Sequence, residues 1–327
     1  MRLWYASVNY GLEQAVAGIL KTHGAGNIRT LDSALVFSCR DEINVKCVNN
    51  LFEILSSFSS KSILEAAKRI PEGPFPFPRV RGRTFRIIAM DCGKLRPIPH
   101  DIMNAIEKSV SRQTRLSVNR ANPDLEIWLN RRNDGSVYFM LRVGKHRPFD
   151  KTLKKGELRP DIVEVMIHEA GIDRDSTVAD LFGGWGAIAA ALVESGRCRK
   201  TYTGDINDEC VRHQKKRLHG KRNCVVQKWD ARRLPLGDGS LDAIVTDPPW
   251  GEYEAIDASR LYEEFIAEAA RVLRPGGSLV FLTSSGDQAR RSLDTHGFSH
   301  SRVPLRIGGK DTFLFRAEAG NTRRRAH

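Results

Sequence analysis

The strongest constraint on the fold is a regular alternation of strand-like and helix-like segments between residues 161 and 307. A run such as Ala243-Ile244-Val245 is apolar at consecutive positions, which is typical of a strand covered on both faces. Repetition of strand and helix predicts an α/β domain whose mostly parallel sheet has helices on both sides. The predicted strands are 177–182, 201–204, 224–228, 241–246 and 278–283, the predicted helices are 161–170, 187–194, 208–218, 260–273 and 287–295, and a hairpin around Gly308-Gly309 follows.

The first half of the chain has a different organisation, in which two small α+β units are expected. The first unit, residues 1–78, has predicted strands at 3–8 and 34–37 and predicted helices at 12–20, 45–55 and 63–70. It ends in a proline-rich run over 71–78, interpreted as a linker because proline lacks the backbone N–H that helices and sheets use. The second unit, residues 79–148, has predicted strands at 84–90, 124–130 and 137–143 and a helix at 101–111. Residues 149–160 are then expected to link it to the domain at 161–318, and residues 319–327 to form a basic tail.

The charge balance favours a polyanionic partner. A formal net charge of +13 produces a positive field that attracts nucleic acid first and an anionic membrane surface second. Basic residues recur in clusters, and although a single cluster is typical of a solvated face, their number favours phosphate contacts. One cluster, on or just after the predicted helix 208–218, consists of Arg212, Lys215, Lys216, Arg217, Lys221 and Arg222.

Targeting, membrane and metal signals are missing from the sequence. No apolar run approaches the roughly 20 residues that span a bilayer, and residues 1–9 become polar too early for a signal peptide. We therefore expect a cytoplasmic protein that does not bind membranes. The six cysteines include no Cys-x-x-Cys pair, so neither a zinc site nor a redox motif is predicted, and no metal is expected.

A glycine-rich turn follows the first strand of the α/β domain, in Asp180-Leu181-Phe182-Gly183-Gly184-Trp185-Gly186. Glycines at such a turn let the backbone approach a ligand and direct the amides of a helix N-terminus toward it. Acidic residues end the next two strands, where they are suited to accept hydrogen bonds from ribose hydroxyls and an adenine amino group. The predicted cofactor-binding residues are Asp180, Phe182, Gly184, Gly186, Asp205, Asp230 and Ala231.

The position of Asp180 selects the kind of nucleoside. A dinucleotide site favours Gly-x-Gly-x-x-Gly without an acid at the strand end, because a carboxylate there repels the pyrophosphate. The α-ammonium group of S-adenosylmethionine would be attracted to Asp180 instead. The sequence therefore predicts S-adenosylmethionine rather than NAD as the cofactor, and leaves the role of Trp185 between the glycines open.

A second motif, Asp247-Pro248-Pro249-Trp250, ends the fourth strand and predicts the reaction. The lone pair of an exocyclic base amine is conjugated into the ring, so the amine is a poor nucleophile. A carboxylate that accepts one N–H and a carbonyl that accepts the other can turn the lone pair toward a methyl donor. Asp247 and the Pro248 carbonyl suit these tasks, and Trp250 offers a face on which a base can stack. We therefore predict Asp247, Pro248 and Trp250 as the catalytic residues.

These residues resemble those of known enzymes. The C-terminal half looks like the class I methyltransferase fold, and Asp247-Pro248-Pro249-Trp250 resembles the (Asn/Asp)-Pro-Pro-aromatic signature of amino-group methyltransferases. Segments around 11–13, 85–87, 122–127 and 155–160 are similar to the N-terminal and junction segments of THUMP-domain-containing tRNA guanine-N2-methyltransferases. The glycine turn departs from that family's usual Phe-Cys-Gly-Ser-Gly-Thr. The resemblance implies a Rossmann-like domain with a seven-stranded, mostly parallel sheet and an antiparallel last strand, preceded by ferredoxin-like and THUMP domains.

The same resemblance implies a function. It points to formation of N2-methylguanosine in tRNA, at a guanine in or near the acceptor stem. We expect tRNA to be the partner, and we expect a monomer that needs no obligate protein partner. Two alternatives remain open. One is an N6-adenine methyltransferase acting on DNA or another RNA, since nothing in the catalytic motif excludes adenine. The other is an RNA-binding protein whose catalytic domain is vestigial or depends on a partner.

Overall fold

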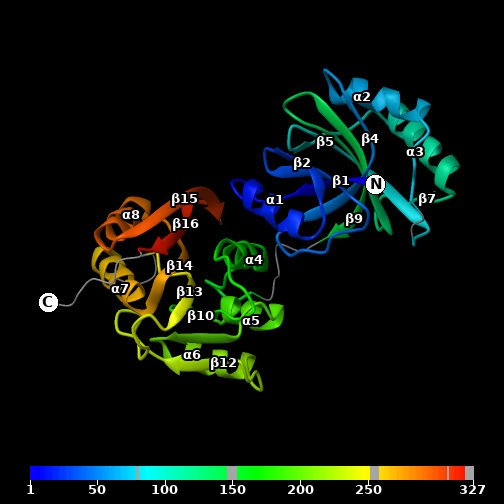
Figure 1. Cartoon of the computed structure of the whole chain (residues 1–327). Coiled ribbons are helices and arrows are strands. Elements are labelled where there is room, and N and C mark those ends of the chain that lie inside the picture. The colour runs from blue at the N-terminus through cyan, green and yellow to red at the C-terminus, as the bar shows by residue number, and fades with distance from the viewer. Residues whose placement is uncertain (79–80, 146–152, 251–257, 308, 321–327) are drawn as a thin grey trace. The chain divides into compact units, whose positions relative to one another are not determined.

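The computed structural model describes residues 1–78, 81–145, 153–250, 258–307 and 309–320 (Figure 1). The chain forms two compact units, which are described separately. The first contains residues 1–7, 20–44 and 48–145, and the second contains residues 8–19, 45–47 and the described residues from 153 onward. Within the described residues, no helix is long and apolar enough to cross a membrane.

The first unit is built on one nine-stranded sheet. Its strand order is β2-β3-β1-β4-β9-β8-β5-β6, with β7 paired to β5. The strands are β1 (Arg2–Ser7), β2 (Gly26–Leu31), β3 (Ala34–Cys39), β4 (Asn50–Ser59), β5 (Thr84–Asp91), β6 (Lys94–Leu95), β7 (Ser117–Val118), β8 (Leu125–Arg131) and β9 (Ser136–Lys145). Helices α2 (Ile63–Arg69) and α3 (His100–Thr114) share an apolar core with β5, β8 and β9.

The sheet runs across the boundary that the sequence suggested near residue 78. Strand β4 pairs antiparallel with β9, and one core holds residues from both sides of the boundary, such as Ala66 and Phe139. The proline-rich run packs onto this core, with the Phe75 ring 4.7 Å from that of Phe139 between centroids. The run therefore follows the surface of the unit and is not a free linker. The division of this half into ferredoxin-like and THUMP domains stays a prediction.

One sequence-based prediction in this unit is wrong. Residues 45–55 were expected to be helical, but Asn50–Ser59 is strand β4, which pairs with β1 on one side and β9 on the other. The apolar residues of this segment fit a helical and a strand period equally well over so short a run, and pairing with two neighbours decides between them.

The second unit contains the predicted α/β domain, and its fold class is confirmed. Its seven-stranded sheet has the order β12-β11-β10-β13-β14-β16-β15, parallel except for β16, which runs antiparallel to both neighbours. The helix pairs α4/α5 and α7/α8 lie on opposite faces of this sheet (Figure 1). The strands are β10 (Thr177–Asp180), β11 (Lys200–Asp205), β12 (Cys224–Lys228), β13 (Leu241–Thr246), β14 (Leu273–Thr283), β15 (Phe298–Ile307) and β16 (Lys310–Ala319). The helices are α4 (Pro160–Glu169), α5 (Ala187–Ser195), α6 (Asp208–Arg217), α7 (Ala258–Val272) and α8 (Gly286–Thr295), and most of α1 (Glu13–Thr22) also belongs to this unit.

The start of α4 differs from expectation. The helix predicted to begin at residue 161 begins at Pro160, with Arg159 as its N-cap, and the missing N–H of a proline in the first turn costs nothing. Asp161 accepts hydrogen bonds from the Arg159 guanidinium. Of the other predicted features, residues 149–152 of the linker, Gly308 of the hairpin and residues 321–327 of the tail lie outside the described residues.

Candidate active site

The candidate site lies at the carboxyl edge of the second sheet, where parallel strands bring their last residues together. Asp180 ends β10 and Asp205 ends its neighbour β11, while Asp247 directly follows β13 on the other side of β10. Because these three strands are neighbours, their carboxyl groups gather at one edge of the sheet. Burial raises the pKa of Asp180, and the negative charges of Asp205 and Asp247 raise it further. Ligands of open α/β sheets bind at this edge.

Asp180 is the deepest group of the site. Its side chain is buried, and Oδ1 accepts a hydrogen bond of 2.9 Å from the Thr246 hydroxyl. The same hydroxyl accepts the N–H of Phe182 at 3.0 Å, so Thr246 ties the end of β13 to the start of the glycine turn. Burial raises the pKa of Asp180 to about 8, and the neighbouring carboxylates add to the shift. Among the side chains that the structure describes, no cation pairs with this carboxyl group to stabilise its charged form.

A buried glutamine supports the glycine turn through hydrogen bonds. Gln214 of α6 donates from Nε2 to the Gly184 carbonyl at 2.9 Å, and its Oε1 accepts from the Thr203 hydroxyl at 3.0 Å. Gly184 and Gly186 have φ angles of 47° and 81°, in the left-handed region that glycine adopts without strain. Both predicted glycines therefore shape the turn that precedes α5.

Gly183 is required by space. A Cβ atom there would lie 2.4 Å from Thr203 Oγ1 and 2.7 Å from Gln214 Nε2. We expect Gly183→Ala to destabilise the protein by about 1–3 kcal/mol, as overpacking does in a close-packed interior, and to weaken cofactor binding. Gly237→Ala, where no atom lies within 4 Å, is the matched control. Urea unfolding and calorimetric cofactor titration measure both effects, and equal stability of the two variants would contradict this account.

Asp205 supports the turn from the next strand. Its Oδ2 accepts the Gly184 N–H at 2.9 Å, and its Oδ1 accepts the Asn207 N–H at 2.9 Å. Asn207 in turn caps α6 through its side chain, which accepts the Glu209 N–H. The carboxylate is therefore fixed in direction, and each oxygen retains a lone pair for a further donor.

Asp230, predicted to accept from an adenine amino group, lies after β12 and forms an ion pair with Arg232 at 2.6 Å. The hydrogen bond from the Arg232 side chain lowers the pKa of Asp230. Both carboxylate oxygens accept from this guanidinium, so an adenine contact would share an oxygen with it or displace it. The adjacent Ala231 is buried.

Asp247 and Trp250 are brought together. The Trp250 indole N–H donates to Asp247 Oδ1 at 3.1 Å, which fixes one oxygen and leaves Oδ2 as an acceptor for another group. Asp247 keeps some contact with solvent as a residue, but its carboxyl group is withdrawn from water, and this desolvation raises its pKa to about 7. Pro248 between them is buried.

Trp185 faces away from these carboxylates. Its indole N–H donates to the Lys155 carbonyl at 3.0 Å, the Lys154 ammonium lies 3.9 Å from its ring centroid, and the ring meets His213 edge-on. The Trp185 carbonyl also accepts from the Arg217 guanidinium at 3.1 Å. Trp185 therefore fastens the segment before α4 and the helix α6 onto the glycine turn.

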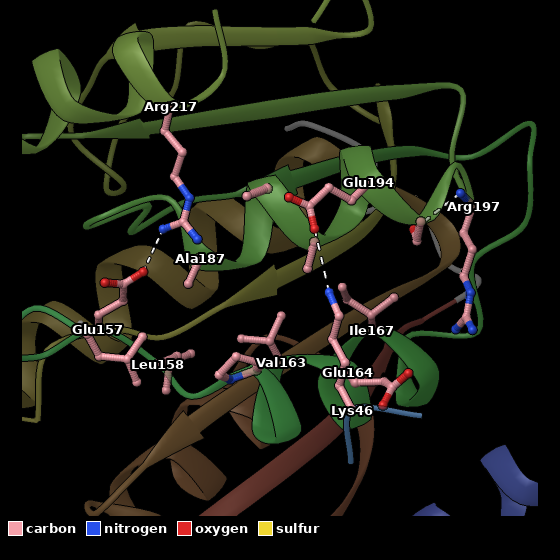
Figure 2. Close-up of a pocket in the computed structure, with 15 residues that line it drawn as sticks. Lys46, Glu157, Leu158, Val163, Glu164, Ile167, Ala187, Glu194, Arg197 and Arg217 are labelled. Atoms are coloured by element: carbon pink, nitrogen blue, oxygen red, sulfur yellow. Dashed lines mark hydrogen bonds and ion pairs between the residues drawn. The ribbon is translucent and has the colours of Figure 1, made fainter. Parts of the chain in front are cut away.

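A cavity of about 320 Å³ lies between α4, α5 and residues 153–160 (Figure 2). The Glu157–Arg217 ion pair of 2.6 Å crosses its rim. None of the predicted site residues lines it. We therefore assign the chemistry to the strand ends and not to this cavity.

Three residues that shape the site were not found from the sequence. Thr246 and Gln214 make the buried hydrogen bonds described above, and the Trp229 indole donates to the Leu181 carbonyl at 2.9 Å. Thr246 immediately precedes Asp247, and its polar side chain directly after the apolar run Ala243-Ile244-Val245 was the available signal. Gln214 and Trp229 act through contacts distant in the chain, which no local pattern reveals.

Comparison with known proteins places this geometry in context. Residues 147–309 match the family described as the RMKL-like methyltransferase domain, UPF0020. Over 247 residues the chain is 25% identical to the tRNA (guanine(6)-N2)-methyltransferase of Thermus thermophilus, covering 70% of this chain and 71% of that protein. Over 139 residues it is 32% identical to the tRNA (guanine(10)-N2)-dimethyltransferase of Methanothermobacter thermautotrophicus, covering 41% and 39%. The crystal structure of TrmN from Thermus thermophilus shares the fold, with a TM-score of 0.79 at 19% identity over 98% of this chain and 100% of that one.

The sheet order and the acidic strand ends define the class of Rossmann-like methyltransferases that use S-adenosylmethionine. With the match over residues 147–309, the predicted cofactor and enzyme class are confirmed. The protein is an S-adenosylmethionine-dependent methyltransferase, and its residues 147–309 are similar to the RMKL-like methyltransferase domain.

Proposed function

We propose that this enzyme methylates N2 of a guanine in tRNA, in or near the acceptor stem, and forms N2-methylguanosine. The observation that carries the proposal is the pairing of Asp247 and Trp250 beside Asp180 at the carboxyl edge of the sheet. A carboxylate with one free oxygen next to an aromatic ring suits a flat base that bears an amino group. The names of the two relatives, both tRNA guanine-N2-methyltransferases, support guanine and tRNA.

The residues at the strand ends fit the cofactor. The buried Asp180 carboxyl lacks a counter-cation, and the α-ammonium of S-adenosylmethionine would supply one. We assign the ribose hydroxyls to Asp205, whose direction is fixed by two backbone amides. Backbone approach at the turn is assigned to Phe182, Gly184 and Gly186, and the adenine ring to Asp230 and Ala231. When bound, the cofactor supplies an electrophilic methyl group.

The chain's own residues then activate the amine. We assign one guanine N–H to Asp247 Oδ2, the oxygen that Trp250 leaves free, and the other N–H to the Pro248 carbonyl. Accepting both hydrogens turns the nitrogen lone pair out of conjugation and toward the methyl donor. Stacking on Trp250 contributes ~1–3 kcal/mol, and fixed orientation supplies much of the remaining rate enhancement. The proton released on transfer can pass to Asp247.

The pH dependence of the rate follows from this role. Because desolvation raises the pKa of Asp247 to about 7, the acceptor is ionised above pH 7 and protonated below it. At saturating cofactor and tRNA we expect kcat to fall roughly tenfold per pH unit below 7 and to level off above it. Asp247→Asn, which has no such titration, should lose this acidic limb. A wild-type kcat that is constant between pH 5.5 and 7.5 would contradict the assignment.

A paired guanine must leave its stack to reach this site, which costs a few kcal/mol. We assign binding of the tRNA backbone during this step to the N-terminal half. Residues 1–148 contain 23 Lys and Arg residues and 13 Asp and Glu residues, so this half carries a net positive charge. We interpret this half as the ferredoxin-like and THUMP domains, and we expect the enzyme to act as a cytoplasmic monomer.

The test is direct. Purified enzyme is incubated with total tRNA and isotopically labelled S-adenosylmethionine, and the digested nucleosides are identified by mass spectrometry. The proposal predicts label in N2-methylguanosine, at one position when single tRNA species are mapped. Label in N6-methyladenosine would favour the adenine alternative, because the same acceptors fit any exocyclic amine, and no label in any nucleoside would favour a binding protein without activity.

A further inference from the structure

Positive charge is concentrated on one part of the catalytic unit. Residues 197–228, from three residues before β11 to the end of β12, hold ten Lys and Arg against three Asp and Glu, a net charge of +7. Over residues 149–327 there are 29 Lys and Arg against 26 Asp and Glu, a net charge of +3. The rest of this half is therefore net negative, and the positive field of the catalytic unit comes from β11, α6 and β12.

Helix α6 displays this charge on its outer face. Val211, Gln214 and Leu218 are buried on the inner side. Among the described residues, no salt bridge is recorded for the basic residues of the outer side, all of which are exposed. This set, called the outer face of α6, consists of Arg212, Lys215 and Lys216 on the helix and of Lys221 and Arg222 just after it.

The inner side of the same helix holds the cofactor turn. His213 and Arg217 contact the Trp185 carbonyl, and Gln214 contacts the Gly184 carbonyl. A ligand on the outer face would therefore lie about one helix diameter, roughly 10 Å, from the glycine turn. Helix α6 also begins at the ligand edge, because Asn207 caps it and donates its backbone N–H to Asp205.

The distance across the sheet, from the end of β11 to the site of the reacting base at the end of β13, is also short. Strand β11 is separated from β13 only by β10, so at 4.7–4.9 Å per strand their ends lie roughly 10 Å apart. Arg212 and Lys216 lie five and nine residues after Asn207, about 8 and 13 Å along the helix at 1.5 Å per residue. These cations are therefore placed to contact phosphates a few nucleotides along the strand from a base held at Asp247.

We propose that the outer face of α6 is an RNA-backbone contact surface of the catalytic unit, distinct from the N-terminal half. The proposal rests on the proposed function for its partner, an RNA strand, whose phosphates match a row of exposed Lys and Arg side chains. An acidic protein or an anionic membrane would also be attracted, and the test separates these partners.

The test is the double variant Lys215→Glu/Lys216→Glu in the full-length enzyme. We expect tRNA affinity at about 100 mM salt to fall tenfold or more, and the slope of log K against log salt to decrease by about 2, as loss of two phosphate contacts requires. The affinity for S-adenosylmethionine and kcat at saturating tRNA should stay within twofold. Lys215→Gln/Lys216→Gln, which removes charge without reversing it, should give an intermediate loss, and thermal unfolding confirms that each variant is folded.

Arg290→Glu/Arg291→Glu on α8 is the matched control, because it makes the same change of charge on an exposed helix of the same unit. It should bind tRNA within twofold of the wild type. An α6 variant that binds as tightly as this control would overturn the proposal, and so would wild-type binding to phosphatidylserine vesicles or an acidic peptide with none to RNA.

A second probe separates this proposal from the proposed function. Binding to an unrelated RNA hairpin is measured beside methylation of tRNA. If the wild type methylates no tRNA but the α6 variant loses hairpin binding, the contact surface stands and the proposed function falls. If the wild type forms N2-methylguanosine and the α6 variant binds RNA normally, the function stands and the contact surface falls.

Discussion

Replacing Asp247 by alanine should lower kcat for methyl transfer by roughly 10²–10³-fold or more, the cost of removing one fixed hydrogen-bonding group from a transition state. The Ala side chain accepts no N–H from the base, so the amine lone pair stays conjugated. It also frees the Trp250 indole, which now donates to Asp247 at 3.1 Å. Single-turnover methylation of tRNA with labelled cofactor measures the loss.

The affinities for tRNA and S-adenosylmethionine should change by less than threefold in Asp247→Ala, because Asp247 acts on the amine and not on either partner as a whole. Asp247→Asn is the graded variant: its amide oxygen remains an acceptor, so its kcat should lie between those of Asp247→Ala and the wild type. Wild-type turnover by Asp247→Ala would refute amine activation by this carboxylate.

Replacing Asp180 by asparagine should stabilise the protein while it impairs cofactor binding. The native pKa of Asp180 is raised from 3.8 to about 8, so the folded state binds a proton that the unfolded state releases. Its contribution to stability is greatest below pH 4 and is lost as pH rises toward 8. At 1.36 kcal/mol per unit the upper limit is roughly 5 kcal/mol. We expect a gain of about 2–3 kcal/mol at pH 8, since the Asn amide hydrogens need partners.

Urea unfolding between pH 4 and pH 8.5 measures this effect. The wild type should lose stability across that range, and Asp180→Asn should lose less. Asp287→Asn, at a carboxylate with an 80% exposed side chain on α8, should change the unfolding free energy by less than ~0.5 kcal/mol. Cofactor affinity should fall tenfold or more in Asp180→Asn alone. Identical pH profiles of wild type and Asp180→Asn would contradict a buried, uncompensated carboxyl group.

Such opposite effects of one substitution on stability and binding are expected where a site holds a charge ready for its ligand. Among the described residues, the Thr246 hydroxyl is the side chain that donates a hydrogen bond to the Asp180 carboxyl group, at Oδ1. The carboxyl is therefore kept poorly stabilised in the folded protein, and the energy is recovered when a cation binds.

The α/β half could be predicted closely from the sequence, because its signals are local. Strands such as Leu241–Thr246 contain an apolar run, here Ala243-Ile244-Val245, and the acids and glycines follow the strands closely in the chain. The parallel order then places those residues at one edge. The seven-stranded, mostly parallel sheet with an antiparallel last strand was implied by the resemblance and agrees with the structure.

The first half was harder to predict because its organisation depends on pairing between distant segments. Strand β4 pairs with β9, more than 80 residues later, and this pairing turns a segment with helical periodicity into a strand. Short strands such as Lys94–Leu95 carry too few residues for any period to be recognised. In the site, the supports Gln214 and Trp229 were missed for the same reason, since each reaches a backbone carbonyl far away in the chain.

The central claim is that the tip of β13 holds an exocyclic base amine by two acceptors. A crystal structure of the enzyme with S-adenosylhomocysteine and a guanosine-containing oligonucleotide tests it most directly. The account predicts the guanine N2 within hydrogen-bonding distance, about 2.7–3.2 Å, of both Asp247 Oδ2 and the Pro248 carbonyl oxygen, with the base on the Trp250 face. A base bound elsewhere, or N2 directed away from Asp247, would contradict it.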